Sequence, residues 1–428
     1  MYQKLTLKNG LPVLLAPKKD SKSVVIFLIY KVGSRYEKTK KIYGISHFIE
    51  HLMFKGTKKR PSTLALSKEL DSIGADYNAY TAKDHTAYHI KANAENMEIA
   101  CEIMSDMINN SLFDKSKLEQ EKGVILEEIK MYEDQPIQYA EMLFEEQIFS
   151  GSDLEHNIAG TRESVKGISR ADIIDYLQKF YAPQNAILVI AGKIEPNINK
   201  ILNQYFVRQS FGQKFLKQAE FKPLIIKQKQ PQAILSPKQT NQAHIALGFP
   251  AYAYNHPKLY AFYVLATILG GNMSSRLFID VREKEGLCYY IRAQADVYED
   301  TGDLLIRAGL DINKLDKGLK IISRDLKAIK EKGITSEELL KAKKFLKGRL
   351  ILQLEELNDL AEFYGREFIL TQKMMTPEQK INKILAVSKK EVDQVAREIL
   401  NKSKLNFAMV SPFKDKNKFI KLINLWKL

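Results

Sequence analysis

Two pairs of apolar segments recur at the same separation along this chain of 428 residues. The segments 23–30 and 185–191 are rich in β-branched and aliphatic residues, which predicts buried strands. Similar segments, 243–249 and 405–410, follow them about 220 residues later. A repeat at two separate points predicts a tandem duplication, and therefore two domains of similar fold.

Helices are predicted between these strands, because apolar residues there recur at helical spacing. The predicted helices cover residues 42–54, 116–132, 258–269 and 337–355. Ser116 with Glu119 and Thr335 with Glu338 have the spacing of capping boxes for the two longer helices. Strands mixed with helices indicate an α+β fold, so we expect two similar α/β-sandwich domains, each a mostly antiparallel sheet with helices packed on it.

The domain boundary is predicted where the composition changes. Residues 211–232 are rich in lysine and glutamine, contain Pro223 and Pro231, and show no sustained periodicity. We therefore expect an N-terminal domain at 1–210, a linker at 211–232 and a C-terminal domain at 233–428.

The composition is that of a soluble globular protein with a basic surface. The 66 basic and 51 acidic residues give a net charge of +15, which could attract nucleic acid, acidic membranes or acidic peptides. The lysines are spread along the chain without a nucleic-acid-binding motif, which favours a solvated surface and no nucleic-acid partner. Cys101 and Cys288 stand in apolar contexts, as free thiols do. No apolar run predicts a membrane span and residues 1–10 contain no signal-peptide stretch, so we expect a cytoplasmic protein.

The strongest chemical signal is the sequence His-Phe-Ile-Glu-His at residues 47–51. Residues four apart lie on one face of a helix, so His47 and His51 can bind one metal ion through their imidazoles. Glu50 lies on the same side, where its carboxylate can take a proton from a water molecule at the metal. A chance pattern on an ordinary helix is the competing interpretation.

A catalytic zinc needs a third protein ligand and one open position. The predicted helix 116–132 offers four glutamates, Glu119, Glu121, Glu127 and Glu128. Glu121 and Glu128 are seven residues apart and share a partly apolar stripe, so one could bind the metal while the other orients a histidine ring. Spacing alone does not exclude Glu127, and an acidic solvated helix face is the alternative.

Three segments together resemble the pitrilysin family of peptidases, the inverzincins. Residues 47–57 (HFIEHLMFKGT) resemble the motif region of that family, and residues 121–132 (EKGVILEEIKMY) resemble its downstream glutamate helix. The similarity continues through residues 74–88 (GADYNAYTAKDHTAY) and into the second half, so it covers most of the chain.

The resemblance assigns a role to each residue of the motif. It implies a zinc metalloendopeptidase with one Zn²⁺ per chain, held by His47, His51 and Glu128. Glu50 matches the general base of the family, and Glu121 matches the carboxylate that supports a histidine ligand.

The resemblance also implies how substrate is held. Arg282 and Tyr289, in the segment SSRLFIDVREKEGLCY, match an arginine and a tyrosine that contact substrate. From the residues alone, Arg282 would be a solvated surface residue and Tyr289 a half-buried strand residue. The segment Asn78-Ala79-Tyr80 is similar to the family's substrate-binding edge strand.

Side chains beside that strand are expected to form a pocket. Phe54 and Tyr80 could line a pocket beside the scissile bond, with core packing as the alternative for Phe54.

Family members of about this length form two-chain clamshells. The resemblance therefore implies a homodimer that encloses peptides or unfolded segments, in which the zinc of one chain faces Arg282 and Tyr289 of the other. The alternatives are a catalytically inactive scaffold subunit of the same fold, a nucleic-acid-associated protein, and another zinc hydrolase such as an amidase.

Overall fold

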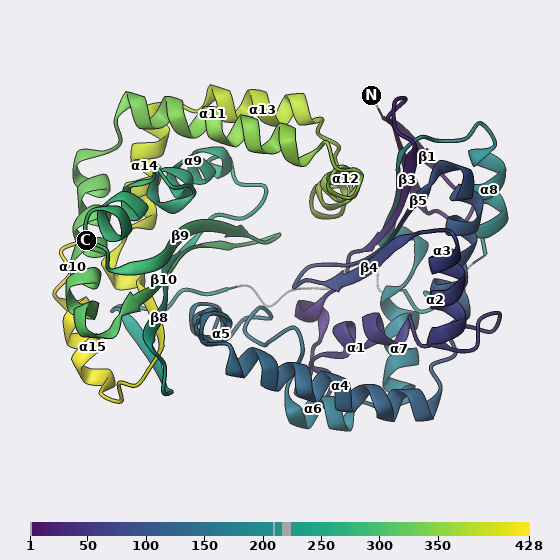
Figure 1. Cartoon of the computed structure of the whole chain (residues 1–428), viewed down its shortest axis with the longest axis horizontal. Helices are drawn as coiled ribbons and strands as arrows, with labels where there is room; N and C mark the ends of the chain where they lie inside the picture. The colour runs from purple at the N-terminus through teal and green to yellow at the C-terminus, as the bar shows by residue number, and fades with distance from the viewer. Residues whose placement is uncertain (1, 209, 216–223) are drawn as a thin grey trace. The chain divides into compact units, whose positions relative to one another are not determined.

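The computed structural model describes residues 2–208, 210–215 and 224–428, and it contains two β-sheets, each with its own helices (Figure 1). Each sheet belongs to one of two compact units. The first unit comprises Met1–Ile129, His156–Phe221 and Ile351–Thr376; the second comprises Lys130–Glu155, Lys222–Leu350 and Pro377–Leu428. Part of the predicted linker, residues 216–223, lies outside the described residues.

The first unit contains a six-stranded sheet in the order β1-β2-β6-β3-β5-β4. Its strands are β1 (Gln3–Thr6), β2 (Pro12–Pro17), β3 (Ser23–Tyr30), β4 (Asp76–Thr81), β5 (Thr86–Asn93) and β6 (Ala186–Gly192). β2 pairs with β6 in parallel, and the other neighbours are antiparallel. The central strand β3 is buried on both faces, as its continuous run of apolar residues predicts.

The second unit contains a five-stranded sheet in the order β7-β11-β8-β10-β9. Its strands are β7 (Gln232–Pro237), β8 (Gln242–Ala251), β9 (Cys288–Val297), β10 (Gly302–Asp311) and β11 (Asn406–Ser411). β7 and β11 are parallel and the other pairs antiparallel, so this sheet repeats the order and directions of β2-β6-β3-β5-β4. The predicted α+β fold with a tandem duplication is confirmed.

Helices cover both faces of the first sheet. One face packs against helices that follow its strands in sequence: α1 (Ile45–Leu52), α2 (Thr63–Ser72), α3 (Met97–Asn110), α4 (Lys115–Asp134), α6 (Arg162–Gly167), α7 (Arg170–Phe180) and α8 (Ile198–Tyr205). The opposite face packs against α12 (Leu357–Thr371), which comes from the second half of the sequence (Figure 1).

The second sheet has the corresponding arrangement. One face packs against helices that include α9 (Leu259–Gly270), α10 (Leu315–Lys332), α11 (Ser336–Gln353), α14 (Lys389–Ile399) and α15 (Lys416–Asn424), and α13 (Pro377–Ala386) joins the same unit. The other face packs against α5 (Pro136–Ile148), from the first half of the sequence. The two halves thus exchange one helix each, while the domain limits 1–210 and 233–428 stay a prediction.

Of the two capping boxes predicted from the sequence, the structure contains one. Thr335 and Glu338 form the expected reciprocal cap, with hydrogen bonds of 2.7 and 3.1 Å. The cap expected from Ser116 and Glu119 is wrong. The carboxylate of Asp114 instead accepts a hydrogen bond from the backbone N–H of Ser116 at 2.8 Å, so α4 begins at Lys115.

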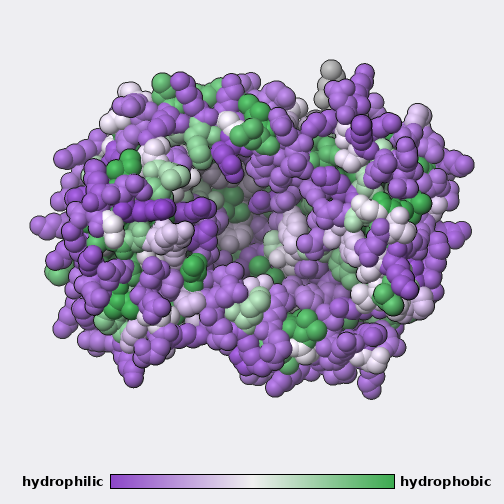
Figure 2. Space-filling view, in the orientation of Figure 1, coloured by the Kyte–Doolittle hydropathy of each residue, from purple (hydrophilic) through white to green (hydrophobic). Residues whose placement is uncertain are grey.

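The surface and the cysteines agree with what the composition predicts, a hydrophilic surface and two free thiols. The face shown in Figure 2 is mostly hydrophilic, with apolar side chains scattered over it. Cys101 is buried, Cys288 is half-buried, and both are free thiols. Among the described residues, no helix combines the length and apolarity that a membrane span requires.

Candidate metal centre

The motif helix α1 is buried and is anchored at its N-terminus by a carboxylate. Glu37, itself buried, accepts hydrogen bonds from the backbone N–H groups of Gly44 at 2.7 Å and Ser46 at 2.9 Å. His156 contacts the same carboxylate at 3.1 Å. Gly44 has a φ of +89°, and a side chain there would collide with the carbonyl of Ala159. The helix therefore starts at Ile45, not at residue 42 as the sequence suggested.

Removing this cap should weaken the whole motif helix. Glu37→Ala leaves two buried N–H groups without their acceptor, so we expect the free energy of unfolding to fall by about 2–3 kcal/mol. Urea unfolding of the purified chain measures this loss, and metal titration should show weaker binding in the variant. Unfolding and metal affinity both equal to those of the wild type would contradict the role of Glu37.

Three side chains from α1 and α4 converge on one point. The Nε2 atoms of His47 and His51 lie 3.1 Å apart. The Oε2 atom of Glu128 lies 3.6 Å from the first and 3.5 Å from the second. Among the described residues, these three form the only group of histidine, cysteine or acidic side chains with the spacing of a metal site.

The triangle of donor atoms has the dimensions of a zinc site. Zinc bonds of 2.0–2.1 Å in tetrahedral geometry place neighbouring ligand atoms about 3.3 Å apart. The three observed distances, 3.1, 3.5 and 3.6 Å, surround that value. Burial, with His51 as a second cause, lowers the pKa of His47 to about 3, so its imidazole is neutral, as a ligand must be. His47, His51 and Glu128 can therefore hold a zinc ion and leave a fourth position open.

Glu121 orients one histidine of the triangle, as expected for a supporting carboxylate. Its Oε1 atom accepts a hydrogen bond from Nδ1 of His51 at 2.9 Å, which directs the Nε2 lone pair toward the centre. Lys55 binds the other carboxylate oxygen at 2.8 Å. Burial alone would raise the pKa of Glu121, but the hydrogen bonds from His51 and Lys55 lower it, so the group stays ionised. The sequence prediction missed Lys55, although it follows His51 by four residues.

Glu50 is held from the neighbouring sheet. The hydroxyl of Thr81, the last residue of β4, donates a hydrogen bond of 2.6 Å to Oε2 of Glu50. Burial raises the pKa of Glu50, and this hydrogen bond acts in the opposite direction. The sequence prediction missed Thr81, although it directly follows the segment singled out as a substrate strand.

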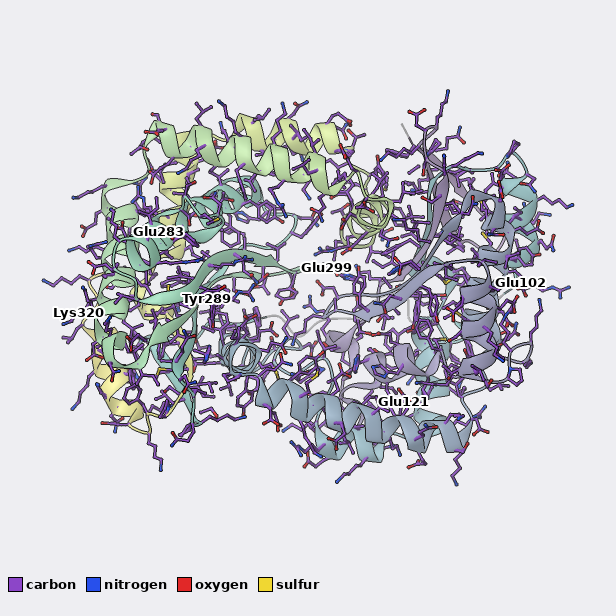
Figure 3. All side chains as sticks on the ribbon, viewed as in Figure 1. Glu102, Glu121, Glu283, Tyr289, Glu299 and Lys320 are labelled. Carbon is purple, nitrogen blue, oxygen red and sulfur yellow. The ribbon has the colours of Figure 1, made fainter. Side chains whose placement is uncertain are left out.

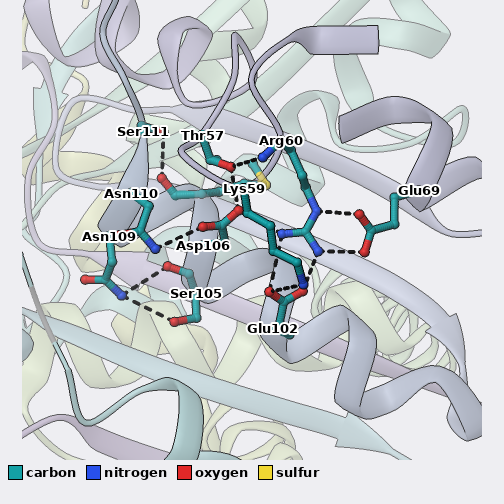
Figure 4. A network of polar contacts seen from close by, with 11 residues as sticks. Thr57, Lys59, Arg60, Glu69, Glu102, Ser105, Asp106, Asn109, Asn110 and Ser111 are labelled. Carbon is teal, nitrogen blue, oxygen red and sulfur yellow. Dashed lines mark hydrogen bonds and ion pairs between the residues drawn. The ribbon is translucent and has the colours of Figure 1, made fainter. Parts of the chain in front are cut away.

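A buried ionic network fixes the loop that follows α1 (Figure 4). The guanidinium of Arg60 binds Asp106 at 2.7 Å and Glu69 at 2.6 Å, and also pairs with Glu102. The hydroxyl of Thr57 donates to Asp106 at 2.5 Å. Removal of one partner from such a network leaves an uncompensated buried charge, so the loop is firmly tied to α2 and α3.

The residues predicted to hold substrate divide between the two faces of β4. This strand is the edge of its sheet, as expected, and carries Asn78, Ala79 and Tyr80. Ala79 faces the α1 side, while the ring of Tyr80 packs with the cluster under α12. Phe54 packs on the α1 side, so Phe54 and Tyr80 do not line one pocket.

Arg282 and Tyr289 belong to the second unit, where they form a contact of their own. The Arg282 guanidinium stacks on Tyr289 at 5.4 Å from the ring centroid and on Phe278 at 4.6 Å. Tyr289, at the start of β9 and labelled in Figure 3, is 76% exposed. This exposure leaves its hydroxyl accessible from solvent.

The second half of the chain retains the helix but not the chemistry of the motif. α9 follows β8 as α1 follows β3, and its sequence LYAFYVLATILG contains no histidine and no acidic residue. Of the other acidic candidates on α4, Glu119 pairs with Lys122 at 3.0 Å and Glu127 is exposed. The duplicated fold thus carries one group of metal-binding side chains among its described residues.

Two family models match the two halves of the chain. A family model described as "Insulinase (Peptidase family M16)" matches residues 13–162, and one described as "Peptidase M16 inactive domain" matches residues 167–346. The second description suits a half of the chain whose equivalent helix, α9, lacks metal ligands.

Similar proteins extend over nearly the whole chain. A Bacillus subtilis protein named as an uncharacterised zinc protease is 35% identical over 96% of this chain and 98% of its own length. A Streptomyces coelicolor protein with the same description is 32% identical, over 97% and 90%. A solved protease from Helicobacter pylori has the same fold, with a TM-score of 0.87 at 23% identity over 96% of this chain and 99% of its own. The resemblance to the pitrilysin family is confirmed, and the chain belongs to the insulinase family of peptidases, family M16.

Proposed function

We propose that this protein is a zinc-dependent endopeptidase that hydrolyses peptides or unfolded polypeptide segments. The observation that supports this most strongly is the triangle formed by His47, His51 and Glu128, whose edges match the ligand spacing of tetrahedral zinc. Relatives that are named as zinc proteases support the same metal.

The chain's own residues divide the work of hydrolysis. His47, His51 and Glu128 would hold one zinc ion, which supplies Lewis acidity to polarise a peptide carbonyl and to lower the pKa of water. Glu50 takes the proton from the attacking water and delivers it to the leaving amine. Glu121 keeps the ring of His51 in the orientation and tautomer that a ligand needs.

Substrate is proposed to bind as an added strand at the edge of β4. Peptide main chain pairs with the free edge at Asn78, Ala79 and Tyr80, a mode of binding that reads conformation more than sequence. Arg282 binds substrate backbone, and Tyr289 stabilises the negative charge that develops on the carbonyl oxygen. We place this activity in the cytoplasm.

The active form is proposed to be a homodimer whose active sites are completed in trans. Mixing Glu50→Gln chains with Tyr289→Phe chains should then restore activity, because subunit exchange creates one site with both wild-type residues. At full exchange of two inactive variants, about a quarter of the sites would be intact. Peptidase assays before and after mixing measure this recovery. A fully active preparation that is monomeric by light scattering would contradict the arrangement.

The peptidase function itself is tested by digestion of a peptide library. The zinc-loaded chain should cleave unstructured peptides, and mass spectrometry should locate the cut bonds. A chelator should abolish cleavage, and added zinc should restore it. A chain that binds zinc but cleaves no peptide would contradict the proposal and identify the protein as a scaffold of the same fold.

A further inference from the structure

Strand β4 reaches the proposed active site with a side chain as well as with its edge. Thr81 is the last residue of β4, and its hydroxyl donates to Oε2 of Glu50 at 2.6 Å. Within the described part of the chain, no other side chain donates a hydrogen bond to Glu50. The hydrogen bond thus fixes one of the two oxygens of the carboxylate that is proposed to take the proton.

The hydroxyl is mounted on a rigid part of the fold. The backbone of Thr81 pairs with that of Thr86, and the hydroxyl of Thr86 donates to the carbonyl of Val32 at 2.8 Å in the core. The turn that follows is closed by the hydrogen bond from Ala82 N to His85 O at 2.8 Å. Threonine is also restricted at χ1 by its branched β-carbon. The donor atom therefore has little freedom to move.

Glu50, in contrast, reaches the site through a flexible side chain. Three torsions separate its carboxylate from α1, and each of them has more than one allowed setting. A single fixed donor selects the combination that suits proton transfer, which depends steeply on geometry.

We propose that Thr81 is the positioning residue of the general base Glu50, an inference that rests on the proposed peptidase function. The strand that docks substrate main chain thereby also orients the carboxylate that activates water. Thr81 belongs neither to the metal triangle nor to the proposed docking segment Asn78-Ala79-Tyr80. Its loss should therefore affect the chemical step and leave substrate binding intact.

The matched pair Thr81→Val and Thr81→Ser tests this role. Valine keeps the shape and strand preference of threonine but lacks the donor, whereas serine keeps the donor. For a peptide that the wild type cleaves, we expect Thr81→Val to lower kcat by about 10- to 100-fold with KM within about twofold. Thr81→Ser should recover most of kcat. Zinc stoichiometry and zinc affinity should be unchanged in both variants.

A second measurement does not depend on activity. In the full-length, metal-free chain, Thr81→Val should shift the midpoint of thermal unfolding by a different amount in the wild type than in a Glu50→Ala background, because the second background has no acceptor. Additive effects of the two substitutions would overturn the proposed hydrogen bond.

The outcomes separate this inference from the peptidase function. An active wild type whose kcat survives Thr81→Val unchanged would overturn the inference and leave the function standing. Parallel losses of zinc and kcat would also overturn it, because they indicate a merely structural role. An inactive wild type with bound zinc would refute the peptidase function. The inference would then fail as well, because Glu50 would not act as a general base.

Discussion

Glu50→Gln should retain zinc and lose almost all peptidase activity. The amide has the size of the carboxylate and still accepts the Thr81 hydrogen bond, but it cannot take a proton from water. General base catalysis contributes about 10²- to 10⁴-fold, so we expect kcat to fall by that factor or more. Steady-state cleavage of a fluorogenic peptide, together with zinc analysis of the same sample, measures both quantities.

A conservative change at the supporting carboxylate provides the control for this experiment. Glu121→Gln keeps an acceptor for His51 and leaves Glu50 in place, so it should weaken zinc binding more than it lowers kcat at saturating zinc. Glu50→Gln should show the opposite pattern. Full hydrolysis by a preparation of Glu50→Gln free of other peptidases would refute the role of Glu50 as base.

Glu128→Gln should remove zinc, whereas Glu127→Gln should not. The two glutamates are neighbours on α4, and both substitutions remove one negative charge. Only the Glu128 carboxylate lies within 3.5–3.6 Å of the two histidine nitrogens. Because a neutral amide is a poor zinc ligand, we expect zinc affinity to fall by at least about 100-fold for Glu128→Gln and by less than about twofold for Glu127→Gln.

Competition with a chelating dye measures both affinities under the same conditions. Peptidase activity should follow zinc occupancy, so that Glu127→Gln cleaves like the wild type. Loss of zinc from Glu127→Gln, with zinc retained by Glu128→Gln, would show that Glu127 and not Glu128 is the third ligand. Equal losses in both variants would indicate that the charge of α4, and not ligation, controls binding.

The sequence predicted the part of the site that lies within one helix. The spacing of His47, Glu50 and His51 places them on one face, and local helical geometry alone brings them together. The strands were also predictable, because the segments 23–30 and 243–249 are rich in apolar residues, most of which the structure buries. Matching offsets along the chain then revealed the duplication.

The choice of the third ligand could not be made from spacing. Glu127 and Glu128 differ by one position on α4, and only the packing of α4 against α1 decides which of them faces the histidines. The same limit applies to Glu37 and Thr81, which reach the motif helix from a loop and from a strand. No local sequence pattern predicts these contacts of Glu37 and Thr81, because they form only when distant segments pack together.

The exchange of α5 and α12 between the two halves could not be predicted from local sequence either, because it also depends on packing between distant segments. Each helix has an apolar side that either sheet could bury, and periodicity does not say which sheet accepts it. The structure packs α12 against β3 and β6, and α5 against β8 and β11. The side chain of Tyr80 is therefore under α12, away from the face that carries Glu50.

X-ray diffraction from zinc-loaded crystals, recorded on both sides of the zinc absorption edge, tests the central claim most directly. We predict one strong anomalous peak per chain, about 2.0–2.1 Å from Nε2 of His47, Nε2 of His51 and a carboxylate oxygen of Glu128. A crystal with zinc bound at other side chains, or with these three donors directed to separate places, would contradict the assignment of the metal centre and of the peptidase built on it.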